Sequence, residues 1–132
     1  AGGRQVSASI QRRLDHPGVR FVRHLDRQRY LSWMAAADVM IGNSSSGIIE
    51  AASLSLPVIN VGSRQRLRER SANVIDVEAR VEAIRAGIER LPALGPGPWP
   101  NVYGDGRASE RIVSLLASVP LDPAILNKQN QY

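Results

Sequence analysis

The sequence predicts an α/β domain built around a parallel sheet. Three observations lead to this fold class: strand-like and helix-like segments alternate, the strand candidates are short apolar runs, and turn-forming residues separate the segments. Strands that helices cover on both faces show such continuous runs, whereas a strand with one wet face alternates apolar and polar residues. Each element can be justified in chain order.

The amino-terminal part of the chain predicts a helix, a strand and a second helix. Residues 4–15 carry apolar side chains at helical spacing, and the sequence His16-Pro17-Gly18 ends that helix. Residues 19–25 form a short strand candidate, and residues 27–37 predict a helix. The apolar positions of the two helices are Val6, Ile10 and Leu14, and Tyr30, Leu31, Met34 and Ala35.

A strand, a helix and a second strand follow in the middle of the chain. Residues 39–41 form a short apolar run, and residues 45–54 predict a helix. Pro57 stops this helix and opens the strand at residues 58–61. The side chains of the helix that we expect to face the core are Ile48, Ile49, Ala52 and Ser53.

The carboxyl-terminal part predicts a strand at residues 74–77 and a helix at residues 78–91. A loop rich in proline and glycine follows at residues 94–100, and Gly104-Asp105-Gly106 forms a tight turn. The last full helix is expected at residues 108–119. Its apolar residues Ile112, Leu115 and Leu116 are expected to face inward.

The composition excludes several kinds of site. The chain has no cysteine, and His16 and His24 lack the spacing of a metal site, so we expect neither disulfides nor a structural zinc. No apolar stretch approaches the roughly 18 residues that span a membrane, and the start of the chain lacks the apolar core of a signal peptide. We therefore expect a cytoplasmic location and no membrane partner.

The chain is basic, with a net charge of +5 that comes from 16 arginines, one lysine and 12 acidic residues. A basic protein can bind a polyanion, which keeps a basic nucleic-acid-binding module open as an alternative. Binders of single strands interleave aromatic residues with positive charge, and aromatic residues are scarce here. We expect no nucleic-acid partner and interpret the cluster Arg64, Arg66, Arg68 and Arg70 as a solvated helix face, with Arg64 as the exception.

Ser44, Ser45, Ser46 and Gly47 lie between the strand at 39–41 and the next helix. Ligands of an open parallel sheet bind beyond the carboxyl ends of its strands, and a helix amino terminus offers unpaired N–H groups to an anion. Serine hydroxyls add donors, and a glycine lets the backbone come close. One serine would satisfy helix capping, so three serines and a glycine favour a phosphate site.

Two further residues extend this site toward a nucleotide. Arg64 follows the strand at 58–61, so it should emerge at the same edge of the sheet, where its guanidinium could bind a diphosphate with two parallel hydrogen bonds. Glu50 would repel a bare phosphate, but it could accept hydrogen bonds from the hydroxyls of a ribose. Ordinary pairing with the helix dipole explains Glu50 equally well.

Three segments, in the same order as in a known family, carry a resemblance: RHLDRQRYLSWMAAADVMI, IGNSSSGIIEAASLSLPVINVGSRQ and NVYGDGRASERIVSLL. They resemble the carboxyl-terminal half of UDP-N-acetylglucosamine 2-epimerases. The hydrolysing branch, which feeds sialic-acid-type sugar synthesis, is most similar, because it shares the NSS(S)G…E and G-(S/T/D)-R-Q forms. UDP-diacetylbacillosamine hydrolases look similar too. The resemblance extends from Ala1 to about Leu126.

The resemblance implies a Rossmann-like doubly wound parallel sheet that forms part of the second domain of a GT-B fold. In such enzymes the second domain binds UDP, and the active site lies between the two domains. Ser44 and Ser45 match the residues that hold the diphosphate. Glu50 matches the acid that grips the ribose, Arg64 the arginine of the nucleotide pocket, and Leu25 the position whose backbone meets the uracil. The residues expected to bind UDP are Leu25, Ser44, Ser45, Ser46, Gly47, Glu50 and Arg64.

The resemblance also implies a reaction. Family enzymes remove the proton at C2 of the sugar and expel UDP, which leaves a glycal, and the hydrolysing branch then adds water and releases N-acetylmannosamine from UDP-N-acetylglucosamine. The carboxylates that transfer protons belong to the first domain. We therefore expect no catalytic residue, no metal ligand and no cofactor site in this chain, and we expect the chain alone to be inactive.

We expect residues 1–132 to be an incomplete carboxyl-terminal UDP-binding domain. By resemblance, the first strand, first helix and second strand of this domain precede Ala1, as does the whole amino-terminal domain. In the strand order 3-2-1-4-5-6, the missing strands would leave a gap between residues 19–25 and residues 39–41. The tail at 121–132 would cross back toward the first domain. The expected partners are UDP-N-acetylglucosamine or UDP, the amino-terminal domain, and further copies of the protein.

A GT-B glycosyltransferase is the second enzymatic interpretation. It would use the same nucleotide pocket but transfer the sugar to an acceptor. The segments GNSSSGIIEA and YGDG together favour the epimerase.

Overall fold

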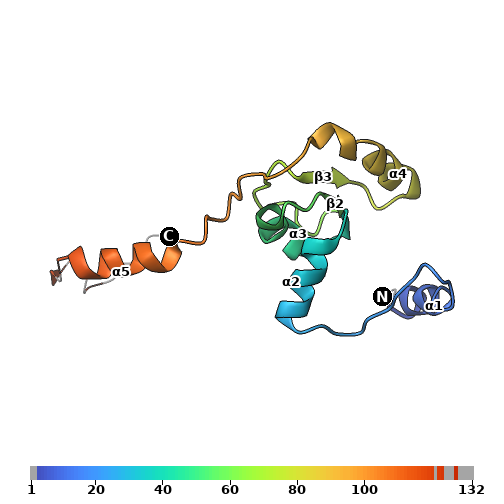
Figure 1. The fold of residues 1–132 in the computed structure, drawn as a ribbon, viewed down its shortest axis with the longest axis horizontal. Helices are drawn as coiled ribbons and strands as arrows, with labels where there is room; N and C mark the ends of the chain where they lie inside the picture. The colour runs from blue at the N-terminus through green and yellow to red at the C-terminus, as the bar shows by residue number, and fades with distance from the viewer. Residues whose placement is uncertain (1–2, 121, 124–126, 128–132) are drawn as a thin grey trace. The chain divides into compact units, whose positions relative to one another are not determined.

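The computed structural model of the chain describes residues 3–120, 122–123 and 127. The chain divides into two compact units, Ala1–Ala36 (unit 1) and Ala37–Tyr132 (unit 2), which are described separately below (Figure 1). The tail at 121–132, which we expected to cross toward another domain, lies almost entirely outside the described residues. No helix in the described part of the chain is both long and apolar enough to span a bilayer.

Unit 1 contains the helices α1 (Gly3–Gln11) and α2 (Arg27–Ala36). The predicted helix at 27–37 is thus confirmed, whereas the one at 4–15 is shorter than predicted because residues 12–15 form turns. The predicted strand at 19–25 is wrong for the described structure, in which this segment pairs with no strand. A strand is stable only as part of a hydrogen-bonded ladder, and apolar character alone does not supply the neighbour.

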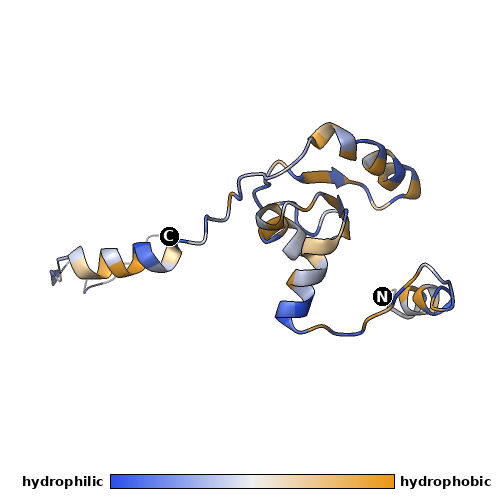
Figure 2. Cartoon of the chain, in the orientation of Figure 1, coloured by the Kyte–Doolittle hydropathy of each residue, from blue (hydrophilic) through white to orange (hydrophobic). Residues whose placement is uncertain are grey.

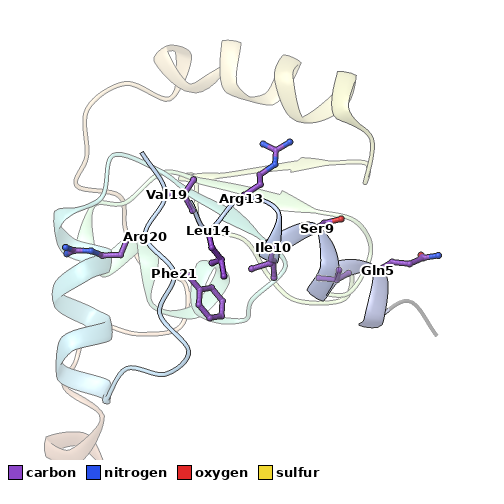
Figure 3. A pocket seen from close by; sticks show the side chains of 9 residues that line it. Gln5, Ser9, Ile10, Arg13, Leu14, Val19, Arg20 and Phe21 are labelled. Carbon is purple, nitrogen blue, oxygen red and sulfur yellow. The ribbon is translucent and has the colours of Figure 1, made fainter. Parts of the chain in front are cut away.

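Unit 1 also has an apolar hollow of about 580 Å³ (Figure 3). Its lining includes Ile10 and Leu14 from α1 and its following turn, and Val19 and Phe21 from the segment beyond, while the Arg20 guanidinium points away from them. These apolar side chains are 40–53% exposed. None of the residues expected to bind the anion lines this hollow, so it is not the predicted anion site.

Unit 2 is built on a parallel sheet with the order β1-β2-β3. The strands are β1 (Met40–Gly42), β2 (Val58–Val61) and β3 (Val74–Val77). The predicted strands at 58–61 and 74–77 are confirmed, and the one at 39–41 is shifted by one residue. In register, Gly42 pairs with Asn60 and Asn60 pairs with Asp76. Among the described residues β1 is an edge strand, as expected if further strands belong beside it.

Helices cover both faces of this sheet (Figure 1). Successive side chains of a strand point to opposite faces, so Val58 and Ile59 of β2 mark the two faces. A Cβ atom added to Gly47 of α3 (Ser46–Ile49) would lie 3.0 Å from Val58 Cγ1, and one added to Gly87 of α4 (Val81–Glu89) would lie 3.4 Å from Ile59 Cγ2. The two helices therefore pack on opposite faces, which confirms the predicted α/β class.

The helix predicted at 45–54 is interrupted. It consists of α3 and the 3₁₀ helix η1 (Ala51–Leu54), which meet at Glu50. The core-facing positions are shifted by about one residue, because the buried residues are Gly47, Ile48, Ala51 and Ala52 and Ser53 is exposed. The tight 3₁₀ turn ends at Ser55, whose φ of 53° reverses the chain before β2.

The remaining helices are η2 (Leu91–Leu94) and α5 (Ala108–Ser118). The helix predicted at 78–91 is shorter than expected, since α4 ends at Glu89. α5 is confirmed, but the expectation that its apolar residues face inward is wrong for the described chain, where Ile112, Leu115 and Leu116 are 55%, 59% and 76% exposed. An apolar stripe is buried only where another element packs on it. Figure 2 shows hydrophobic and hydrophilic residues alternating along α5.

Candidate functional site

The loops that follow β1 and β2 leave the sheet at one edge. Gly42 and Asn60 pair in register near the carboxyl ends of their strands, so residues 43–47 and 62–65 begin side by side. A hydrogen bond joins the two loops, in which Gln65 Nε2 donates to the backbone oxygen of Asn43 at 2.9 Å. The structure therefore brings the turn that carries Arg64 beside the serine loop (residues 43–47).

The three serines of this loop are half-buried. Ser45 directly precedes α3, but its side chain makes no capping hydrogen bond. Instead, Ser44 Oγ accepts a hydrogen bond from the backbone N–H of Ser46 at 3.3 Å. A side-chain turn at the start of the helix therefore accounts for Ser44, whereas no capping hydrogen bond accounts for the serine at position 45.

The helix behind the serine loop is shorter than the prediction required, because α3 has four residues. A macrodipole grows from many aligned peptide units, so such a short helix contributes little positive potential. The attraction for an anion at the carboxyl edge of the sheet has to come mainly from individual N–H and O–H donors and from Arg64.

Gly47 is buried on the side of α3 that packs on the sheet. A Cβ atom at this position would lie 3.0 Å from Val58 Cγ1 and 3.5 Å from the sulfur of Met40. The missing side chain therefore lets α3 approach β1 and β2 closely. This packing accounts for the glycine without any ligand.

Glu50 is half-buried at the junction of α3 and η1. Asn101, which lies far away in sequence, holds this junction, because its Nδ2 donates to the backbone oxygen of Ile49 at 2.8 Å and to Ser53 Oγ at 2.7 Å. The motif around residues 101–106 thus has a structural task beyond the tight turn that the sequence predicted. It fixes the backbone beside the acid that is expected to bind a ribose.

The arginine cluster does not form the predicted helix face, because residues 64–67 form turns and Arg68 lies in a bend. Arg64, Arg66 and Arg68 are exposed. The side chain of Arg70 is only 21% exposed, and its Nε lies 2.9 Å from Asp76 Oδ2. Within the described residues no carboxylate forms an ion pair with Arg64. The cluster therefore separates into a structural Arg70 and an Arg64 that is exposed at the site.

Asp76 joins Arg70 to the sheet. Asn60, which is 1% exposed, donates from Nδ2 to Asp76 Oδ1 at 2.5 Å. Partial burial raises the pKa of Asp76, but the hydrogen bonds from Arg70 and Asn60 and the charge of Arg70 outweigh it, so the pKa lies below its ordinary value. This network fixes the ends of β2 and β3 where the loops of the site begin.

Leu25 is the one expected site residue outside unit 2. It is half-buried in unit 1, in the segment that forms no strand. Its contact with a uracil stays a prediction.

Gln65 and Asn101 are the positions that the sequence analysis missed. Gln65 is only 4% exposed although arginines flank it in the sequence. An uncharged amide between arginines was the available signal, because a polar side chain of this kind is most useful where it is buried and hydrogen-bonded.

Together, the fold and the site define an α/β domain that presents serine hydroxyls and an arginine at the carboxyl edge of a parallel sheet. Residues 2–117 match the model of a family described as UDP-N-acetylglucosamine 2-epimerase. The chain belongs to this family, which confirms the resemblance carried by the three sequence segments.

Three relatives are similar to parts of the chain. A UDP-N,N'-diacetylbacillosamine 2-epimerase (hydrolyzing) from Legionella pneumophila is 51% identical over 131 residues, which cover 99% of this chain and 35% of the relative. A GDP/UDP-N,N'-diacetylbacillosamine 2-epimerase (hydrolyzing) from Campylobacter jejuni is 53% identical over 55 residues, 42% of this chain and 14% of the relative. A UDP-N-acetylglucosamine 2-epimerase from Neisseria meningitidis is 31% identical over 103 residues, 76% of this chain and 26% of the relative.

Proposed function

We propose that this chain is the UDP-binding half of a hydrolysing UDP-sugar 2-epimerase. The observation that carries the proposal is the joined pair of loops at the carboxyl edge of the sheet, with Gln65 linked to Asn43 directly beside Arg64 and Ser44. The edge of a parallel sheet is where such folds bind nucleotides, and the family membership supports a UDP-linked substrate.

In this proposal the site stabilises the leaving group. When the bond between the sugar and UDP breaks, negative charge develops on the diphosphate. Donors that bind this charge more tightly than they bind the substrate lower the barrier. The hydroxyls of Ser44 and Ser45 and the guanidinium of Arg64 serve as these donors, and Glu50 accepts hydrogen bonds from the ribose hydroxyls.

The proton at C2 of the sugar has to be removed by groups outside this site. By family resemblance they belong to an amino-terminal domain, which we propose as the partner of this chain in a GT-B arrangement. Residues 1–132 would then be an incomplete second domain in a cytoplasmic homo-oligomer. The chain spans 35% of the Legionella relative, which leaves room in such a protein for a further domain.

Two sugars are candidates for the substrate. The resemblance of the sequence favours UDP-N-acetylglucosamine, with N-acetylmannosamine and UDP as products. The higher identity and coverage of the Legionella relative, compared with the Neisseria one, favour UDP-N,N'-diacetylbacillosamine as a second candidate. Both candidates place the same UDP group on the residues described above.

The experiment is to incubate the intact gene product with each UDP-sugar and follow the products by NMR. A hydrolysing epimerase yields free UDP and a free sugar that is inverted at C2. Formation of a UDP-linked epimer would place the protein in the non-hydrolysing branch. Product formation that required an added acceptor would indicate a glycosyltransferase and would contradict the proposal.

A further inference from the structure

We propose that Gln65 is a positioning residue that aims the Ser44 N–H group at the diphosphate. This inference rests on the proposed function, because it assigns a task within the same site. Gln65 is 4% exposed, so its side chain is not available to a ligand. Its amide Nε2 donates to the backbone oxygen of Asn43 at 2.9 Å.

Because the peptide bond is planar, this contact also determines the direction of the Ser44 N–H group. A trans peptide is planar, and its C=O and N–H groups point in opposite directions. When Gln65 holds the Asn43 oxygen, it also fixes the direction of the Ser44 N–H group, which belongs to the same peptide. That N–H group therefore points away from Gln65. We call the hydrogen bond from Gln65 to the Asn43 oxygen the Gln65 clamp. Without this clamp, the peptide could rotate and present its oxygen where the anion needs a donor.

The clamp also couples the two loops of the site. Gln65 directly follows Arg64, which is exposed, and lies in a turn closed by the hydrogen bond from Arg68 N–H to Gln65 O at 3.1 Å. The backbone of Arg64 is thereby held at a fixed distance from the serine loop. A diphosphate needs both groups at once, so a loose connection would lower affinity even with every ligand-contacting residue intact.

The test compares Gln65→Met with a matched control in the intact gene product. Methionine keeps the length and approximate volume of glutamine but has no N–H donor. The control is Asn73→Leu, because Asn73 is also a buried amide that donates to a backbone oxygen, from Nδ2 to Leu56 O at 2.8 Å, but at the amino-terminal ends of β2 and β3. Binding of pyrophosphate, UDP and uridine is measured by calorimetry.

We expect Gln65→Met to raise the Kd for pyrophosphate and for UDP about tenfold, which is about 1.4 kcal/mol, and to change the Kd for uridine less than twofold. Asn73→Leu should change none of the three more than twofold. An unchanged Kd for pyrophosphate in Gln65→Met would overturn the inference. An equal loss for uridine would also overturn it, because the defect would then be general.

A second measurement needs no variant and covers the case in which Gln65→Met does not fold. Hydrogen exchange of the wild-type peptide that contains residues 43–47 should slow when pyrophosphate binds. Binding without slower exchange in this peptide would overturn the inference and leave the proposed function standing. If the wild type binds neither pyrophosphate nor UDP, the proposed function itself fails.

Discussion

At the scale of single residues, we propose that the side chain of Glu50 binds the ribose of the nucleotide. Glu50 lies at the junction of α3 and η1, and its carboxylate would repel a bare phosphate but accept hydrogen bonds from ribose hydroxyls. Glu50→Ala in the intact gene product should weaken UDP binding by about 1.5–3 kcal/mol, the scale of hydrogen bonds to a charged group. Calorimetry should show no such loss for pyrophosphate. Equal losses for both ligands would show that Glu50 does not bind the ribose.

We propose that Arg64 binds the diphosphate, and the geometry of its guanidinium should then matter as much as its charge. Arg64→Lys keeps the positive charge but loses the planar pair of donors. Turnover of the UDP-sugar should fall more than tenfold, or over about 1.4 kcal/mol. Arg66→Lys, an exposed neighbour, is the matched control and should turn over substrate like the wild type. Unchanged kinetics in Arg64→Lys would assign Arg64 to the solvated turn instead.

The sequence predicted which residues meet at one edge of the sheet, but it did not predict which side chains hold the loops of the site by hydrogen bonds. Serines after a strand and an arginine after the next strand follow a rule of parallel sheets, so their shared edge was predictable. The clamps from Gln65 and Asn101 join positions 22 and 52 residues apart. Such contacts depend on the folded path of the chain, and no local pattern encodes them.

At the scale of elements, the Asn101 clamp should stabilise the junction of α3 and η1. Asn101→Ala leaves the oxygen of Ile49 and the hydroxyl of Ser53 without this donor. The free energy of unfolding should fall by about 1–3 kcal/mol, measured by urea denaturation. Tyr103→Phe is the control from the same segment, because its hydroxyl donates to Glu69 O at an exposed site. A loss no larger than that of the control would show that the clamp does not stabilise the junction.

The Arg70–Asp76 pair should make the stability of the sheet edge depend on pH. The pKa of Asp76 is lower in the folded state, so its contribution is present above the unfolded pKa and is lost as pH falls through the folded one. Because Asp76 is 52% exposed, solvent screening limits the contribution to about 0.5–1 kcal/mol. Arg70→Met should therefore be less stable than the wild type at pH 6.

The comparison is made by urea denaturation, and the difference between Arg70→Met and the wild type should shrink as the pH is lowered below about 4. Arg80→Met removes the exposed pair with Glu78 and should differ little from the wild type at either pH. A difference between Arg70→Met and the wild type that stays constant down to pH 2 would contradict the assignment to Asp76.

Strand candidates with a hydrogen-bonded neighbour in the described sheet were predictable from the sequence, and the candidate without one was not. The strands β2 and β3 match their predicted ranges, and they pair with each other along their full lengths, with β2 at the centre of the described sheet. Residues 19–25 include apolar side chains but have no ladder partner among the described residues, and they form no strand. The break at Glu50 lies beside the hydrogen bond from Asn101 to Ile49 O, a contact between residues far apart in the sequence that hydrophobic spacing cannot reveal.

At the scale of the whole molecule, we propose that residues 1–132 form an incomplete domain. Such a domain would leave apolar residues of α1 and α5 exposed, and it would leave β1 with one edge that pairs with no strand among the described residues. We expect residues 1–132 alone to be only marginally stable and inactive toward UDP-sugars.

The central claim is that the serine loop holds the diphosphate of UDP, and calorimetric titration of UDP into the intact gene product tests it most directly. The double variant Ser44→Ala/Ser45→Ala should raise the Kd more than tenfold, or by over about 1.4 kcal/mol, while Ser109→Ala in α5 leaves the Kd unchanged. An unchanged Kd in the double variant, or a wild type that does not bind UDP, would contradict the account.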